Sequence, residues 1–356
     1  LQSIHGAHSI QTPTPKASGA SAASTASHAS KAPTPPSSHA PPPVPSPLPP
    51  GSPVAVVAPA SGPYPPEMMD RYRSGLADLQ DRYDVRTAWE PGGERGYLAA
   101  PDEERTAALN KALHDADIEG IFCVRGGYGC LRLLDRIELP DADRRPPLLI
   151  GYSDVTALHL SLYARRGWTG LSGPVVTEWP QMTPGSPEYV AREHLEAWLA
   201  GDTPALAPFN KTALTPHTTG EGAGPLLGGN LSVLSRLVGT RHCPDFTGSV
   251  LFLEDVQEEP YQIDRKLAHL ELAGLLDNLA GVVLGSFSTP DLDPDTPTLS
   301  LPEIVADYFA ERPYPVATGL AYGHLLPRVT VPVGLRARLR VGDNEATLEA
   351  TEPLAS

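Results

Sequence analysis

The sequence predicts an α/β fold with two domains: an N-terminal Rossmann-like domain on a mainly parallel sheet, and a C-terminal mixed α/β domain. Short apolar strands alternate with helical patterns over residues 53–173, and a second set of strands and helices follows over residues 222–356. A Pro-, Thr- and Gly-rich stretch over residues 174–221 is predicted to link them. Because ligands bind at the carboxyl ends of parallel strands, we expect the functional site at the domain interface.

Four strands carry the N-terminal prediction. They are PVAVV before a helix over 65–82, YDVRTAW before a helix over 102–117, IEGIFCV before RGGYG and a short helix near 131–134, and PLLIG before SDVTALHLSLYARRG. In the first helix, Met68, Tyr72, Leu76 and Leu79 recur at helical spacing. This regular alternation is typical of βα units.

The C-terminal prediction rests on a similar set of segments. They are GPLLGGNLSVLSRLVG, SVLFLEDV, a helix over 263–276, AGVVLGSF, and RARLRVGDNEATLEA, which is predicted to form a hairpin around Gly342 and Asp343. The segment REHLEAWLA predicts one amphipathic helix within the linker.

Residues 1–52 are rich in Ala, Ser, Thr and Pro and contain almost no large apolar side chains. Such a segment buries too little surface to offset its ordering entropy, so we expect a disordered extension with polyproline II character. It could act as a tether or be a passive extension. The sequence leaves open whether the mature protein contains it.

Composition excludes several classes of function. The formal net charge of -15 opposes binding to nucleic acid and to anionic membranes. No apolar run of about 18 residues predicts a membrane span, and no signal peptide is recognisable. Three cysteines without CxxC spacing predict neither a disulfide framework nor a zinc site, and they favour a reducing, cytoplasmic compartment. HExxH is absent, so no metal is expected.

Ser153 is the first candidate for chemistry. It follows the strand in LLIGYSD and precedes a helix, so the turn presents its hydroxyl at the carboxyl edge of the sheet. The N–H groups at the start of that helix, from Asp154 on, could stabilise an oxyanion. Ser153 could instead be a simple helix cap, and the local sequence alone favours the cap because GxSxG is absent.

Further candidates lie at other strand ends. RGGYG, residues 125–129, could supply a second oxyanion donor or be an ordinary turn, and no phosphate-binding motif is matched. His324 lies in a glycine-flanked loop and could act as a base. Glu254 and Asp255 end the strand SVLFLED, where a carboxylate could hold an imidazole. The remaining histidines fall in helical patterns or polar loops.

Taken in order, RGGYG, IGYSD, LLGGNLSVL, LFLEDV with PYQIDR, VLGSF and GH resemble the LD-carboxypeptidase family of serine peptidases. This family includes muramoyltetrapeptide carboxypeptidases and microcin C immunity peptidases. The resemblance spans residues 53–350 and implies a two-domain α/β fold whose nucleophile lies on the N-terminal domain. RGGYG followed by a short helix looks closer to the muropeptide-cleaving branch.

The resemblance implies a triad of Ser153 as nucleophile, His324 as general base and Glu254 as orienting acid. It also implies an oxyanion hole formed by the N–H groups of Asp154 and a glycine of RGGYG, which we place at Gly127. The implied reaction releases the terminal D-alanine of peptidoglycan tetrapeptides by hydrolysis of an L,D bond, with no cofactor and no metal. A small peptide or muropeptide is then the expected partner, and a homodimer is compatible with the sequence.

Three other functions remain open at this stage. An immunity-type peptidase would cleave a peptidyl-nucleotide or acyl-sulfamide conjugate with the same triad. A catalytically silent module would only bind cell-wall peptides, and a nucleotide-binding α/β protein would bind NAD or ATP. In GHLLPRVTVPVG the chain departs from related sequences, which often have Gly and Asn after GH, so the pocket is less certain than His324. Arg125 and Arg328 are candidates for binding a substrate carboxylate, and either could equally be a surface or salt-bridge residue.

Overall fold

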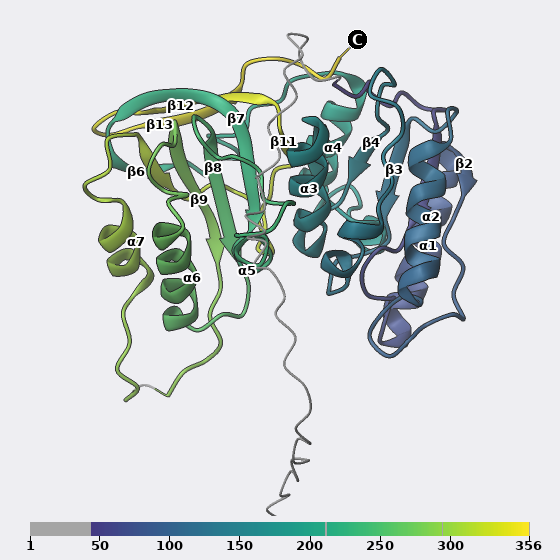
Figure 1. Ribbon diagram of the computed structural model, residues 1–356, viewed down its shortest axis with the longest axis horizontal. Coiled ribbons are helices and arrows are strands. Elements are labelled where there is room, and N and C mark those ends of the chain that lie inside the picture. Colours follow the sequence, from purple (N-terminus) through teal and green to yellow (C-terminus); the bar gives the residue numbers. More distant parts are fainter. Residues whose placement is uncertain (1–43, 211, 294, 356) are drawn as a thin grey trace, which may run out of the picture. The chain divides into compact units, whose positions relative to one another are not determined.

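The computed structural model describes residues 44–210, 212–293 and 295–355. Figure 1 shows two sheets, each with its own helices, which confirms the predicted α/β fold with a mainly parallel N-terminal sheet and a mixed C-terminal sheet. Within these residues, no helix combines the length and the apolar composition needed to cross a membrane.

The first sheet has six strands within the described residues, in the order β11-β5-β4-β3-β1-β2. Their bounds are β1 Pro53–Val57, β2 Asp84–Thr87, β3 Gly120–Cys123, β4 Leu148–Ile150, β5 Gly170–Ser172 and β11 Val331–Val333. All pairs are parallel except β11 with β5. Every residue of β3, β4 and β5 is buried, as expected for parallel strands covered on both faces.

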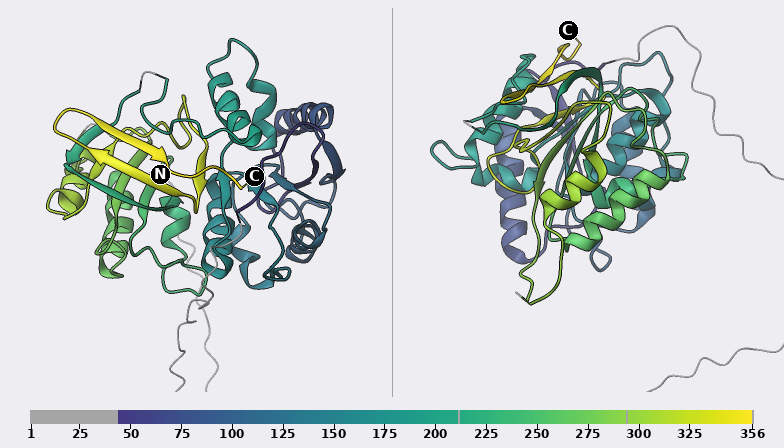
Figure 2. Two further views of the ribbon diagram at one scale, coloured as in Figure 1. Left: turned by 90° about the horizontal axis from the view of Figure 1, so that it is seen from above. Right: turned by 90° about the vertical axis from the view of Figure 1, so that its left-hand side faces the viewer.

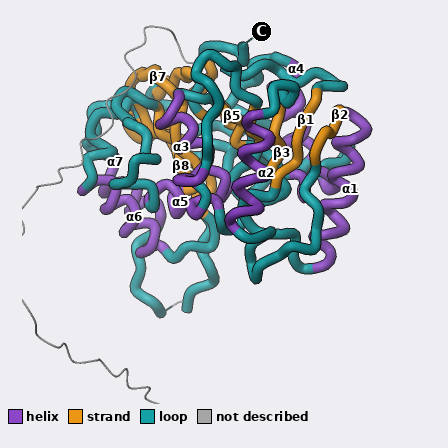
Figure 3. The backbone as a smooth tube through the Cα atoms, turned by 45° about the vertical axis from the view of Figure 1, so that its right-hand side comes forward, coloured by secondary structure: helices purple, strands orange, loops and turns teal. Residues whose placement is uncertain are grey.

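Helices cover both faces of this sheet (Figure 3). The α-helices are α1 Pro66–Arg82, α2 Asp102–His114, α3 Thr156–Arg166 and α4 Tyr189–Ala200, and the 3₁₀ turns are η1 Cys130–Arg132, η2 Leu134–Arg136, η3 Ser153–Val155 and η4 Val176–Gln181. Helix α1 begins at a proline, whose missing N–H would be unpaired there anyway, and α3 ends at Gly167 in the left-handed conformation. The short helix predicted after RGGYG is thus two 3₁₀ turns.

The second sheet has seven strands among the described residues, in the order β13-β12-β7-β8-β9-β10-β6. Their bounds are β6 Thr215–Thr218, β7 Gly220–Asn230, β8 Val250–Asp255, β9 Gly281–Phe287, β10 Val316–Thr318, β12 Arg336–Val341 and β13 Ala346–Ala350. Strands β7 to β10 are parallel, and β12 with β13 is the predicted hairpin. Figure 2 shows this hairpin crossing above the other strands.

Helices α5 Leu231–Ser235, α6 Pro260–Leu272 and α7 Leu301–Phe309 accompany the second sheet. Figure 2 shows α6 and α7 side by side on one face of it. All six residues of β8 are buried, including the two carboxylates at its end. A buried acidic pair requires partners, so this strand end marks a polar site inside the fold.

Two findings refine the predicted organisation. The extension predicted over residues 1–52 lies outside the described residues up to 43, but residues 44–52 pack on the fold. Leu48 is 1% exposed and packs against the position of Gly120, and its N–H donates to the carbonyl of Leu199. The buried side chain of Leu48 and the backbone hydrogen bonds of Leu48, Gly51 and Ser52 hold this segment on the fold. In addition, β11 comes from the C-terminal half of the chain but pairs with β5 of the first sheet.

Candidate active site

Ser153 lies in a sharp turn between β4 and α3. Its φ of 64° is in the left-handed region, which residues other than glycine occupy at a cost and which is typical of functional turns. The N-cap residues of η3 and α3 are Tyr152 and Val155, not Ser153, and the hydroxyl of Ser153 contacts His324 instead. The helix-cap alternative is therefore wrong, and the turn presents the hydroxyl for other contacts.

His324 joins Ser153 to Glu254. The Nε2 atom of His324 lies 3.1 Å from Ser153 Oγ, and its Nδ1 atom lies 2.8 Å from Glu254 Oε2. With Glu254 ionised, Nδ1–H donates to the carboxylate and Nε2 is free to accept the serine proton. The three side chains come from β4–α3, the end of β8 and the loop after β10. An arrangement of this kind can activate a serine hydroxyl as a nucleophile.

The two carboxylates at the end of β8 share Asn230 and differ in their other partners. Glu254 is 0% exposed, and the Nδ2 atom of Asn230 donates to its Oε1 atom at 3.0 Å, leaving Oε2 for His324. Asp255 accepts from Asn230, Ser232 and the buried ammonium of Lys266. Asp255 therefore belongs to a separate ion pair, as the choice of Glu254 over Asp255 requires.

Gly323 allows His324 to approach Glu254. Its φ is 123°, and a Cβ atom there would lie 2.8 Å from Glu254 Oε2 and 2.4 Å from Ser286 Oγ. Only a residue without a side chain fits this place. Steric exclusion of a side chain thus explains why a glycine, Gly323, precedes His324.

The RGGYG loop lies against Ser153. A Cβ atom on Gly126 would lie 2.9 Å from Ser153 Cβ, so a glycine is needed for this close approach. Among the described residues, the N–H groups of Gly127 and Asp154 meet no acceptor. The buried carboxylate of Asp154 accepts from the N–H of Cys130 at 2.8 Å, which ties the loop to the turn. Burial raises the pKa of Asp154.

Arg328 belongs to a buried cluster beneath His324. It pairs with Glu178 at 2.7 Å and donates to the hydroxyl of Tyr152, which in turn donates to Glu178. The ring of Tyr152 lies 5.1 Å from that of His324, measured between centroids. Of the two arginines proposed from the sequence, Arg328 is therefore a salt-bridge residue. Its charge is neutralised by Glu178.

Ser153 lies between two cavities. One, of about 200 Å³, is also lined by His324, Arg71 and Arg125. The other, of about 520 Å³, is lined by Gly127, Asp154 and Asn230 among others, and not by His324. Both are large enough for parts of a small ligand.

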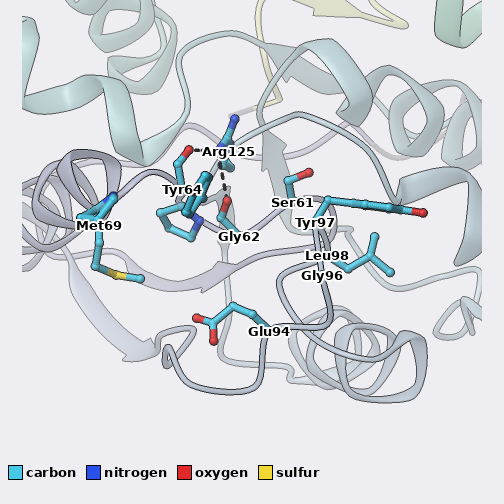
Figure 4. Close-up of a pocket in the computed structure, with 11 residues that line it drawn as sticks. Ser61, Gly62, Tyr64, Met69, Glu94, Gly96, Tyr97, Leu98 and Arg125 are labelled. Carbon is cyan, nitrogen blue, oxygen red and sulfur yellow. Dashed lines mark hydrogen bonds between the residues drawn. The ribbon is translucent and has the colours of Figure 1, made fainter. Parts of the chain in front are cut away.

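A third cavity, of about 500 Å³, adjoins the first and shares Arg125 with it. Figure 4 shows Arg125 bonded to the carbonyls of Gly62 and Tyr64 at the edge of this space, with Tyr97 and Leu98 opposite. Over the described residues, no group of three His, Cys, Asp or Glu side chains could hold a metal ion.

Several residues of the site were not predicted. Asn230 stands in the segment LLGGNLSVL as the last residue of a strand, and that position was the signal available for it. Tyr152 and Glu178 are 26 residues apart and meet through a side-chain hydrogen bond, which no local sequence pattern indicates. Arg71 faces the site from α1, where the sequence pattern shows only an amphipathic helix.

Comparison with known proteins places the chain in a class and a family. Residues 54–173 match the family model of the LD-carboxypeptidase N-terminal domain, and residues 223–339 match that of the LD-carboxypeptidase C-terminal domain. The chain is therefore a hydrolase of the serine-peptidase type. It belongs to the LD-carboxypeptidase family, which confirms the resemblance seen in the sequence.

Individual relatives and solved structures support the same family assignment. The chain is 32% identical to a probable murein peptide carboxypeptidase of Bacillus subtilis over 84% of this chain and 92% of that protein. It is 35% identical to the murein tetrapeptide carboxypeptidase of Pseudomonas aeruginosa over 68% and 79%. A muramoyltetrapeptide carboxypeptidase structure from Oxalobacter formigenes has a TM-score of 0.72 at 27% identity, covering 84% and 99%. The microcin C7 self-immunity protein MccF, with a TM-score of 0.75 at 23% identity over 88% and 100%, shares the fold.

Proposed function

We propose that this protein is a serine carboxypeptidase that releases the terminal D-alanine from murein tetrapeptides by cleaving an L,D bond. The observation that carries the proposal is the hydrogen-bonded chain from Ser153 through His324 to Glu254. A buried carboxylate, an imidazole and a serine in this order are the components of acyl-enzyme catalysis.

In this mechanism Ser153 Oγ attacks the carbonyl carbon of the scissile bond while Nε2 of His324 takes its proton. The N–H groups of Gly127 and Asp154 stabilise the oxyanion, a role supported by their lack of other acceptors. The protonated His324 then gives the proton to the departing amine. Water enters, His324 deprotonates it, and hydrolysis of the acyl-enzyme regenerates Ser153. Glu254 stays ionised and holds Nδ1–H throughout.

The two cavities beside Ser153 suggest how the peptide lies. The leaving amine must be within reach of His324, so the leaving residue occupies the cavity of about 200 Å³ that His324 lines. The acyl part occupies the larger cavity of about 520 Å³ on the other side. A small leaving residue and a bulkier acyl residue fit an alanine leaving from a diamino acid.

The relatives named for murein peptides support this substrate, because they are 32% and 35% identical to the chain and MccF of Escherichia coli is 24% identical. We place the reaction in murein-peptide recycling in the cytoplasm. The three cysteines are free, which suits a reducing compartment.

The test is mass spectrometry of tetrapeptide muropeptides incubated with the wild type, Ser153→Ala and Ser74→Ala. Ser74 is exposed on α1, lines neither cavity beside Ser153, and serves as the matched control. We expect loss of one alanine with the wild type and with Ser74→Ala, and no loss with Ser153→Ala.

A parallel incubation with a peptidyl-nucleotide conjugate separates the two peptidase alternatives. Cleavage of the conjugate and not of the tetrapeptide would contradict the murein proposal. Alanine release by Ser153→Ala at the wild-type rate would contradict the assignment of the nucleophile.

A further inference from the structure

Two arginines line the cavity that holds Ser153 and His324, and among the described residues neither pairs with a carboxylate. Arg125, directly after β3, is half-buried, and its Nη1 atom donates to the carbonyls of Gly62 and Tyr64 at 3.0 and 3.1 Å. Arg71, on α1, donates to the side chain of Gln181 at 3.2 Å. Both guanidinium groups are thus held in place by neutral acceptors, and their charges remain uncompensated.

Other buried cations of the fold, in contrast, are paired with carboxylates. Arg328 is neutralised by Glu178, which also lines the cavity, and Lys266 is paired with Asp255 and Glu258. The cavity therefore has two surplus positive charges in a chain whose formal net charge is -15. Burial lowers the pKa of Arg125, which reflects the cost of holding its charge away from water. An anionic ligand would offset that cost.

A guanidinium group matches a carboxylate in charge and in planar geometry, and such pairs are shorter and stronger than neutral hydrogen bonds. The Nη1 atom of Arg125 faces two backbone carbonyls, as Figure 4 shows, and its Nη2 and Nε atoms make no hydrogen bond to the described residues. These atoms are the donors available to a ligand.

We propose that Arg125 and Arg71 bind the free terminal carboxylate of the residue that leaves. The inference rests on the proposed function, because it takes the leaving residue to lie in the cavity shared with His324. It would restrict cleavage to the last residue of a peptide. A chain that continued past this residue would have no carboxylate to offer the two arginines.

The test uses a pair of substrates that differ only in this group: a murein tetrapeptide with a free terminal carboxylate, and the same peptide as its terminal amide. We expect the wild type to favour the free acid by at least about 100-fold in kcat/KM. Arg125→Gln and Arg71→Gln should each lower this preference by about 10-fold or more, as expected for loss of a charged hydrogen bond. Arg73→Gln is the matched control, since Arg73 is exposed on the same helix and pairs with Asp70.

The proposal is overturned if the wild type cleaves both peptides equally well, or if the two variants keep the wild-type preference. If Arg125→Gln does not fold, Arg71→Gln still tests the proposal. Among the described residues the side chain of Arg71 makes one hydrogen bond, to Gln181, so its replacement should leave the fold intact.

Binding separates this proposal from the proposed function. The Kd values of both peptides are measured by calorimetry with Ser153→Ala in the full chain, with and without Arg71→Gln. In one outcome the wild type cleaves neither peptide, the free acid still binds at least about 10-fold more tightly than the amide, and Arg71→Gln removes that difference. The carboxylate site is then supported, and the proposed function is contradicted. If neither cleavage nor a binding preference is found, both fail.

Discussion

The side-chain amide of Asn230 lies 3.0 Å from Glu254 Oε1, the carboxylate oxygen that His324 does not use. Asn230 is the N-cap residue of α5, and its Oδ1 atom accepts the N–H of Val233, so both ends of its side-chain amide are held. The same Nδ2 group donates to Asp255 at 3.0 Å. One amide thus sets the orientation of the acid in the proposed triad.

We expect Asn230→Ala to lower kcat by about 10- to 100-fold, because a buried carboxylate loses a hydrogen bond and its fixed orientation. Asn230→Asp should be worse, since it places a third carboxylate beside Glu254 and Asp255. Steady-state kinetics checks this, with Asn278→Ala, an exposed position, as the control. Wild-type kcat in Asn230→Asp would refute the positioning role.

Glu254→Gln should lower kcat by about 10⁴-fold, because a neutral amide cannot stabilise the imidazolium and can select the wrong tautomer of His324. Asp255→Asn should affect stability more than activity, because it leaves the buried Lys266 with Glu258 alone. Kinetics and urea unfolding of the two variants separate these effects. Equal activity losses would show that the two carboxylates act as a unit.

Replacing Ser153 tests the strain in the turn. Both Ser153→Ala and Ser153→Gly should lose activity by several orders of magnitude. Ser153→Gly should be the more stable of the two by up to about 1 kcal/mol, because glycine adopts a φ of 64° without the penalty that alanine has. Thermal unfolding of both variants measures the difference. A more stable alanine variant would mean that the turn relaxes when the hydroxyl is removed.

Gly323→Ala should abolish most of the activity, because the added methyl group displaces Glu254 Oε2 from its contact with His324. Gly92→Ala is a close control: its φ of 116° imposes similar backbone strain, yet nothing lies within 4 Å of the added atom. We therefore expect both variants to lose stability and only Gly323→Ala to lose kcat strongly. Equal losses of kcat would assign the effect to backbone strain.

Acid should destabilise the protein through two buried histidines. Burial lowers the pKa of His159 and of His194 to about 4 each, against about 6.5 in an unfolded chain. The unfolded state therefore binds protons that the folded state does not. The stability that the neutral rings contribute is complete above about pH 6.5 and is lost as the pH falls towards 4.

Urea unfolding at about pH 7 and about pH 5 measures this loss. His194→Gln should reduce it, because an amide can still donate to the carbonyl of Ala205 and accept from the N–H of Thr330 without titrating. An unchanged pH dependence in this variant would contradict the assignment to His194.

Local patterns were sufficient for most strands and helices, because β3 and the first four residues of β8 are apolar and are bounded by turn residues. Strands β5 and β11 have three residues each, and Pro332 lies within β11, so no local pattern distinguishes them from loops. Their pairing joins residues far apart in the chain. The end of the extension was misplaced for a similar reason, since Leu48 is anchored only by tertiary contacts.

The site was predictable to the extent that its residues stand in recognisable segments. Ser153, His324 and Glu254 stand in such segments. The family resemblance favoured Glu254 over Asp255, a choice that the residues alone left open. The sequence could not distinguish Arg125 from Arg328, because the difference lies in Glu178, which reaches Arg328 across the fold. Arg71 could not be found at all, since its role depends on which face of α1 borders the cavity.

Strand β11 has a consequence for recombining the two halves of this enzyme. Because Val331–Val333 pairs with β5 along one side, a fragment that ends near residue 221 would leave the backbone N–H and C=O groups on that side of β5 without partners. Such an open edge invites pairing with other chains and aggregation. The N-terminal half is therefore not an independent module that can be exchanged between relatives unless the strand from the far end of the chain travels with it.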